Sequence, residues 1–280
     1  MRLVSFEHRG RPSWGVLDGT LVADLGGAGP YTTLPLALAA LTTADLAALA
    51  SSAQRISTDV LRMLPPVPAP GKILCVMPSR VPHGLDVVPR LADTLVADGE
   101  GLVAPREGWA LNLAGGVGVV VGRPGRHLET ADAWDHVAGL CLFSDVTVAE
   151  HGPGSTFPGR SLPRTAGCGP ALVTLDEAGG REGLVVRTSL NGALVHEAGL
   201  AEAALDVAEA VAHCSRWTQL HPGDIIALLP GGPSQRMSVH PGDVCEVSVD
   251  RIGSLTNVVL DEADVHGAAG EPALSAHTAN

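Results

Sequence analysis

Two side chains near residue 85 have the types and the spacing that proton transfer requires. His83 and Asp86 lie three residues apart, so a helical segment would place them on one face. A carboxylate in contact with an imidazole makes a plausible general base, because the pKa of histidine lies near neutral pH. The alternative is a histidine on a surface loop, since prolines and glycines surround it, and these residues alone favour that alternative.

Other polar motifs give weaker signals. Glu150-His151 could supply a further acid or base, but a solvated loop is the simpler interpretation. His213, His221 and His240 do not have the spacing of metal ligands. The chain contains no Gly-x-Ser-x-Gly motif, so nothing supports a serine nucleophile.

The cysteines indicate a reducing compartment. They are five, an odd number, and they are widely spaced, mostly within or beside apolar runs. This pattern predicts small core residues rather than disulfides or a zinc site. The five are Cys75, Cys141, Cys168, Cys214 and Cys245.

Composition excludes several classes of partner. The chain has 280 residues, of which 45% are hydrophobic and 17% charged, typical of a globular protein with one large domain or one plus a small domain. Its net charge of -12 argues against nucleic acid and anionic membranes, which bind clustered Lys and Arg. Residues 1–20 lack a signal-peptide pattern, and no apolar run is long enough to span a bilayer. We expect a soluble cytoplasmic protein.

The candidate residues must be positioned by a buried sheet. Residues 114–121 are rich in Val and apolar on both faces, which predicts a strand in the middle of a sheet. Gly122-Arg123-Pro124 closes this strand with a turn. A short helical segment over 130–136 and a second apolar strand ending at Ser144-Asp145-Val146-Thr147 follow.

The flanking segments suggest a smaller first domain. Residues 1–25 read as a β-meander with a hairpin at Asp18-Gly19, and helical patterns cover 34–50 and 57–64. The proline-rich stretch 65–71 predicts a stiff linker.

Beyond the linker, residues 72–76 read as the first strand of the main domain, followed by a helix-like pattern over 87–97. Asn191-Gly192 predicts a hairpin, and residues 203–217 predict an amphipathic helix.

Several of these motifs resemble the fumarylacetoacetate hydrolase superfamily over roughly residues 1–260. The run 119–124, Val137-Ala138-Gly139 and 144–147 keep the family's order and spacing, as do later motifs at 159–161, 169–170, 220–227 and 241–247. The resemblance implies an α+β, mainly β fold, with a mixed β-roll or barrel core behind a small N-terminal α+β domain. The expected divisions are 1–64 for the small domain, 65–71 for the linker, 72–262 for the catalytic-type domain and 263–280 for a disordered tail.

The chain departs from this family at its metal site. Members hold Mg²⁺ or a similar ion with two glutamates and an aspartate, whereas Ala114 and Gly116 stand in the glutamate positions here and only Asp145 remains. One carboxylate makes a weak site for an ion that needs about six oxygen ligands. We therefore expect no metal and no other cofactor, with substrate or bulkier side chains in the freed space. The alternative is that Asp86 or Glu150 supplies a replacement ligand.

The resemblance also assigns roles to individual positions. His83 matches the histidine of a His–Glu lid pair that activates water, Asp86 takes the place of the glutamate with one methylene fewer, and Arg160 takes the place of a lysine. Arg160 could bind a carboxylate or polarise an enolate oxygen, or it could form a salt bridge with Asp145 that fills the former metal site. The predicted substrate-binding residues are Met77, Ser79, Arg80, Asp145, Ser161, Leu228, Leu229, Gly231 and Gly232, with Val117 completing an apolar lining.

The sequence is compatible with three functions. The first is a metal-independent enzyme that isomerises, cyclises or decarboxylates an enolisable, polyene or dicarbonyl small molecule in specialised metabolism. The second is a non-catalytic binding protein or supporting subunit. The third is a metal-dependent C–C hydrolase with replaced ligands, which the lost glutamates favour least. Members of the family are commonly dimers, so we expect a homodimer.

Overall fold

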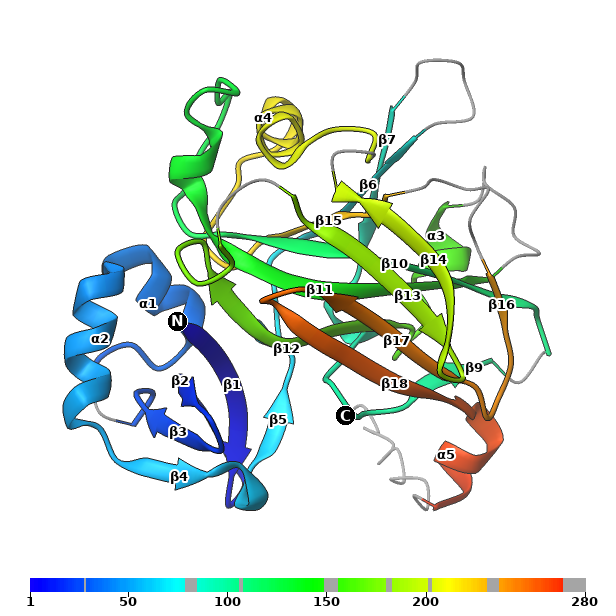
Figure 1. Cartoon of the computed structure of the whole chain (residues 1–280), viewed down its shortest axis with the longest axis horizontal. Helices are drawn as coiled ribbons and strands as arrows, with labels where there is room; N and C mark the ends of the chain where they lie inside the picture. The colour runs from blue at the N-terminus through cyan, green and yellow to red at the C-terminus, as the bar shows by residue number, and fades with distance from the viewer. Residues whose placement is uncertain are drawn as a thin grey trace, which may run out of the picture.

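The computed structural model describes residues 1–27, 29–78, 85–105, 108–148, 156–179, 183–200, 203–230 and 237–268. Two β-sheets contain most of the regular structure, with short helices around them (Figure 1). The α+β, mainly β fold class predicted from the sequence is confirmed. Within these ranges no helix has the length and apolar character needed to cross a membrane.

The strands are β1 (Arg2–His8), β2 (Arg11–Asp18), β3 (Leu21–Asp24), β4 (Arg55–Ser57), β5 (Arg62–Leu64), β6 (Ile73–Pro78), β7 (Leu85–Arg90), β8 (Leu95–Val96), β9 (Leu102–Ala104), β10 (Leu111–Val121), β11 (Val137–Val148), β12 (Ala166–Thr174), β13 (Val185–Leu190), β14 (Ala193–Gly199), β15 (Ile225–Leu228), β16 (Met237–Val239), β17 (Val244–Val249) and β18 (Gly253–Asp261). The α-helices are α1 (Leu34–Ala40), α2 (Thr43–Ser52), α3 (Thr156–Arg160), α4 (Val207–Trp217) and α5 (Glu262–Ala268), and the 3₁₀ turns are η1 (Thr58–Val60), η2 (Ala92–Thr94) and η3 (Ala133–His136).

The larger sheet joins the N-terminal strands to the rest of the chain. Its order is β4-β3-β2-β1-β12-β11-β10-β15-β6-β7. Strand β1 pairs with β12 through Arg2 opposite Val173 and Leu3 opposite Leu172. The first part of the chain therefore shares a hydrogen-bonded sheet with the main part, and the division at 65–71 stays a prediction.

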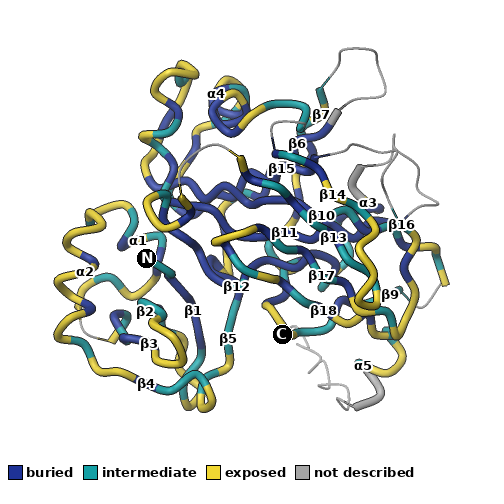
Figure 2. The backbone as a smooth tube through the Cα atoms, viewed as in Figure 1, coloured by how far each residue is buried: buried dark blue, intermediate teal, exposed yellow. Residues whose placement is uncertain are grey.

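Strand β10 occupies the centre that its valines predict. It lies between β11 and β15, and residues 115–121 are buried (Figure 2). The smaller sheet, of order β14-β13-β17-β18-β9, packs against β10 and β11. Val117 and Leu142 from the larger sheet share one apolar cluster with Val247 and Leu255 from the smaller one.

Helix α4 completes this cluster. Its buried face carries Val207, Val211 and Cys214. The Asp206 side chain accepts from the backbone N–H of Glu209, and the Glu209 carboxylate accepts from that of Asp206. This capping box satisfies backbone donors that the first turn leaves free.

Three expectations about local structure are wrong. Residues 57–64 form a 3₁₀ turn between short strands instead of a helix, because 62–64 pair with β1. The helix-like run 87–97 contains β7, η2 and β8, since β7 completes a pair with β6. Residues 263–268, expected in a disordered tail, belong to α5.

Other expectations are confirmed. Hairpins turn at Asp18-Gly19 and Asn191-Gly192, where both glycines and Asn191 have positive φ. The five cysteines are free and buried. The predicted helices over 34–50 and 203–217 are present with other bounds: the first is divided into α1 and α2 and extends to Ser52, and the second begins at Val207.

We expect Asp206→Ala to lower the free energy of unfolding by about 1 kcal/mol, because it removes the side-chain cap of α4. Urea denaturation followed by circular dichroism measures the change. The control is Asp250→Ala, which removes an exposed carboxylate outside any helix and should change stability less. Equal losses in the two variants would contradict the capping role.

Candidate functional site

The candidate site is centred on a carboxylate inside the larger sheet. Asp145 lies near the end of β11, where it is directly opposite Ala114 on β10 and Ala166 on β12. Its side chain is fully buried, at 0% exposure. A buried carboxylate needs close positive partners, because its charge is otherwise unfavourable away from water.

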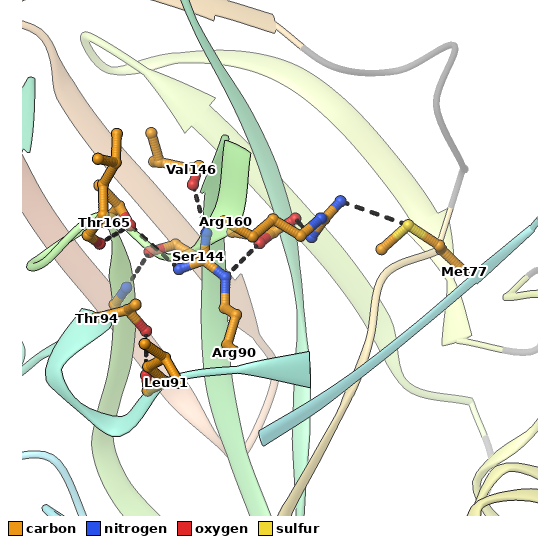
Figure 3. A network of polar contacts seen from close by, with 11 residues as sticks. Met77, Arg90, Leu91, Thr94, Ser144, Val146, Arg160 and Thr165 are labelled. Carbon is orange, nitrogen blue, oxygen red and sulfur yellow. Dashed lines mark hydrogen bonds and ion pairs between the residues drawn. The ribbon is translucent and has the colours of Figure 1, made fainter. Parts of the chain in front are cut away.

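Two arginines supply those partners (Figure 3). Arg160 Nη1 lies 2.5 Å from Asp145 Oδ2, and Arg90 Nε lies 3.0 Å from Asp145 Oδ1. The two guanidinium groups come from separate elements, α3 and β7, and meet the carboxylate at its two oxygens. The salt bridge between Arg160 and Asp145, one of the alternatives raised by the sequence, is present.

Arg90 is held by more than one partner. Its Nη2 donates to the Val146 carbonyl at 2.5 Å, and its Nη1 donates to Thr165 Oγ1 at 3.3 Å. Its side chain is 0% exposed. Burial lowers the pKa of Arg90, although the Asp145 carboxylate opposes this, and an arginine stays charged under either influence.

The sequence did not single out Arg90. The pattern of residues 87–97 is helix-like, and it hides the alternation of a strand. In β7, Val88 and Arg90 are buried while Asp86 and Pro89 are exposed. A strand interpretation would have placed Arg90 beside Val88 on the buried face, and a charged residue there signals a buried partner.

Arg160 keeps one weakly bound arm. Its Nη2 donates to Met77 Sδ at 3.4 Å, and a thioether is a poor acceptor. Burial lowers the pKa of Arg160, but the Asp145 carboxylate and then Cys75 outweigh burial, so the pKa is raised above its ordinary value. The guanidinium group is therefore a permanent cation.

Strand β6 contributes the wall beside Arg160. Cys75 and Met77 are two residues apart and share one face of this strand. Both are buried, Cys75 completely. Burial, and then the Asp145 carboxylate, raise the pKa of Cys75 to about 11, so the thiol is neutral at physiological pH.

The residues present do not fit the divalent ion that the resemblance implies. A Cβ built at Gly116 would lie 2.2 Å from the Leu228 carbonyl oxygen, so no side chain fits there without movement of β15. Ala114 offers no oxygen, and cations already occupy both oxygens of Asp145. Among the described residues, no group of three or more His, Cys, Asp and Glu side chains is arranged to hold a metal.

The expected apolar lining is buried. Val117 and Leu228 are 0% exposed and Leu229 is 4% exposed. Leu229 Cδ2 would lie 2.7 Å from a Cβ at Gly116. The predicted lining does not form one wall, since Val117 and Leu228 belong to one apolar cluster whereas Met77 and Leu229 belong to another.

The remaining predicted residues divide into two groups. Asp86 is exposed on β7 rather than helical, and it lies directly opposite Met77, so the two side chains point to the same face of the sheet. Ser161 follows Arg160, and its Oγ is buried without a hydrogen-bond partner.

The others, His83, Ser79, Arg80, Gly231 and Gly232, lie outside the described residues, as do Glu150 and His151.

Comparisons with known proteins show which family this chain resembles. The model described as "Fumarylacetoacetate (FAA) hydrolase C-terminal" matches residues 77–260. An uncharacterised Staphylococcus saprophyticus protein is 33% identical over 161 residues, which are 54% of this chain and only 53% of that protein. Oxaloacetate tautomerase fahd2, mitochondrial, from Xenopus laevis is 26% identical over 93% of this chain and 90% of its own.

A solved structure resembles the whole fold. Fumarylacetoacetate hydrolase from psychrophilic Exiguobacterium antarcticum superposes with a TM-score of 0.80 at 25% identity. The superposition covers 93% of this chain and 99% of that one. The likeness therefore includes the N-terminal strands as well as the two central sheets.

We expect Arg90→Met to lower the free energy of unfolding by about 3–5 kcal/mol, because it leaves one oxygen of a buried carboxylate without its cation. Arg55→Met is the control, since it breaks an exposed ion pair with Asp18 and should cost less than about 1 kcal/mol. Chemical denaturation measures both. Similar losses would show that the Arg90–Asp145 contact contributes no more than a surface pair.

The Cys75 thiol should make the fold sensitive to alkali. Its pKa rises from an ordinary 9.0 to about 11 in the folded chain, so between these values the unfolded chain releases the proton first. The stabilisation is complete below about pH 9 and is lost as the pH rises toward 11, by up to about 2 kcal/mol. Denaturation at a series of pH values should show a shallower decline in Cys75→Ala, and an unchanged slope would contradict this assignment.

Proposed function

Since the chain belongs to the fumarylacetoacetate hydrolase family, we propose that it isomerises a small enolisable oxo acid without a divalent metal. The family contains enzymes, and the Xenopus relative is named as a tautomerase of oxaloacetate. Enolisation needs a cation near the developing enolate oxygen and a group that moves a proton. The arginine pair and the predicted His83–Asp86 pair correspond to these two requirements.

The observation that carries the proposal is that the guanidinium group of Arg160 has one strong acceptor and otherwise weak ones. Asp145 holds one arm of its guanidinium group, and the partners that the described residues offer to the rest of the group are sulfur atoms, of Met77 at 3.4 Å and of Cys75. A substrate carboxylate or enolate oxygen is a far better acceptor than a thioether, so it would replace Met77 with little competition. The guanidinium group is thereby oriented before the substrate arrives.

The local charge favours an anion. Arg90 and Arg160 together outnumber the single carboxylate of Asp145, and the Cys75 thiol is neutral at physiological pH, so these four side chains carry one surplus positive charge. In a site shielded from water, such a charge interacts strongly with an enolate oxygen. Ser161 Oγ, buried and without a partner, adds a donor next to Arg160 in the chain.

The proton step is assigned to the predicted pair. His83 would remove a proton from the carbon beside the carbonyl group, and the same proton would return to oxygen or to another carbon. This transfer needs no co-reactant, since the product is an isomer of the substrate. The register supports the assignment, because Asp86 is directly opposite Met77, the residue that Arg160 contacts.

The proposal extends to related reactions and to the setting of the enzyme. Cyclisation and decarboxylation pass through similar enolates, so the site chemistry also allows them. We include a role in specialised metabolism, a cytoplasmic location and a homodimer as expectations from the sequence.

A second candidate is a non-catalytic relative. The burial of both arginines favours it, since the Arg160 side chain is only 6% exposed and Arg90 is not exposed. Such a protein would bind a partner or support an active subunit, and it would isolate as a stable complex.

We expect the purified chain to interconvert keto and enol oxaloacetate in the presence of a chelator, and Arg160→Met to lower kcat by about 100-fold or more. Met77→Leu should retain most of kcat, because the substrate displaces the thioether. Ultraviolet absorbance of the enol follows the reaction, and Arg55→Met serves as the control for loss of a surface arginine. Full turnover in Arg160→Met would contradict the assigned role.

Metal dependence is measured on the same batch. Elemental analysis should find no stoichiometric metal, and Mg²⁺ or Mn²⁺ should not raise Tm. A rise in Tm of several degrees, or activity that only the ion restores, would favour a metal-dependent C–C hydrolase instead. Absence of turnover on a panel of enolisable oxo acids would favour the non-catalytic candidate.

A further inference from the structure

A cavity lies at the other end of β11 from Asp145, where the N-terminal helices meet the larger sheet. It has a volume of about 340 Å³, within the lower range of small-molecule sites. Leu38 of α1, Leu41 between the two helices and Leu46 of α2 form one apolar wall, and Trp134 and Val137 from η3 and β11 form another. Helices α1 and α2 lie beside the N-terminal strands, and their outer face is exposed (Figures 1 and 2).

The walls of this cavity are held in place by backbone hydrogen bonds. Strand β1 pairs with β12, which ties the N-terminal segment to the main sheet. The Gly122 and Arg123 N–H groups donate to the His136 carbonyl, at 2.7 and 3.3 Å. These hydrogen bonds join the two ends of the loop between β10 and β11. This wall of the cavity is therefore formed before a ligand binds.

Two opposite charges line the cavity without pairing. Arg123, from the Gly-Arg-Pro turn, and Asp135, from η3, both face it. In the described structure the side chain of neither residue forms a hydrogen bond or an ion pair, although they share one cavity. The Gly-Arg-Pro motif takes no part in the Asp145 site, so that site does not account for Arg123.

We propose that this cavity binds an α-amino acid with a large apolar side chain, such as leucine or phenylalanine. Arg123 would bind the carboxylate, Asp135 would bind the ammonium group, and the leucines with Trp134 would cover the apolar side chain. A ligand with both charges satisfies two residues that do not satisfy each other. The ligand would also contact both the N-terminal helices and β11.

Isothermal titration calorimetry of the full chain tests this with four probes. L-phenylalanine and L-leucine should bind, whereas 3-phenylpropionate lacks the ammonium group and 2-phenylethylamine lacks the carboxylate. Each of these two should bind about tenfold more weakly than L-phenylalanine or worse, since one charged contact is lost. Equal affinity for all aromatic probes would overturn the recognition of a zwitterion.

Variants connect the binding to the cavity. Arg123→Gln should weaken L-phenylalanine and 3-phenylpropionate, and Asp135→Asn should weaken L-phenylalanine and 2-phenylethylamine. The matched controls are Arg11→Gln and Asp132→Asn, exposed residues of the same charge that do not line the cavity. All four positions are exposed, so Tm should stay unchanged. No binding at millimolar amino acid, or binding that both cavity variants retain, would overturn the proposal.

Discussion

A buried carboxylate between two guanidinium groups is the interaction on which the centre of this protein depends. Asp145 is unfavourable inside the sheet unless both oxygens meet cations, and Arg90 and Arg160 satisfy that requirement from elements far apart in sequence. Because Arg90 also binds the Val146 carbonyl and Thr165, the same contact joins β7, β11 and the segment before β12. Charge balance thus fixes the arrangement of the strands around the candidate site.

Close packing around β10 reinforces this arrangement. A Cβ at Gly115 would lie 2.2 Å from Thr188 Oγ1 of the smaller sheet, and a Cβ at Gly116 would lie 2.2 Å from the Leu228 carbonyl oxygen of β15. Gly115 therefore allows the smaller sheet to approach one face of β10, and Gly116 allows the neighbouring strand β15 to approach it within the larger sheet. Gly116, where the resemblance leads us to expect a glutamate, is thus the position at which β15 comes close to β10.

Membership of the family is compatible with exchanged residues at the candidate site for a physical reason. The matching motifs lie in strands, turns and the apolar core, which depend on hydrophobic pattern and backbone conformation. The departures, Ala114, Gly116 and Arg160, lie where side chains face the centre of the site. A fold can keep its core while its charges are exchanged, provided that no buried charge is left without a partner.

The sequence by itself determined the mainly β class, the central place of β10 and β11, both hairpins and the absence of the two glutamates. These follow from local pattern: valine runs, turn residues and motif spacing. Only the tertiary structure decided that Arg90 belongs to the site, because β7 reads as a helix until its pairing with β6 turns Arg90 inward. It also decided that Arg123 and Asp135 share a cavity. Contacts between residues distant in sequence depend on how strands pair, and no local pattern records that pairing.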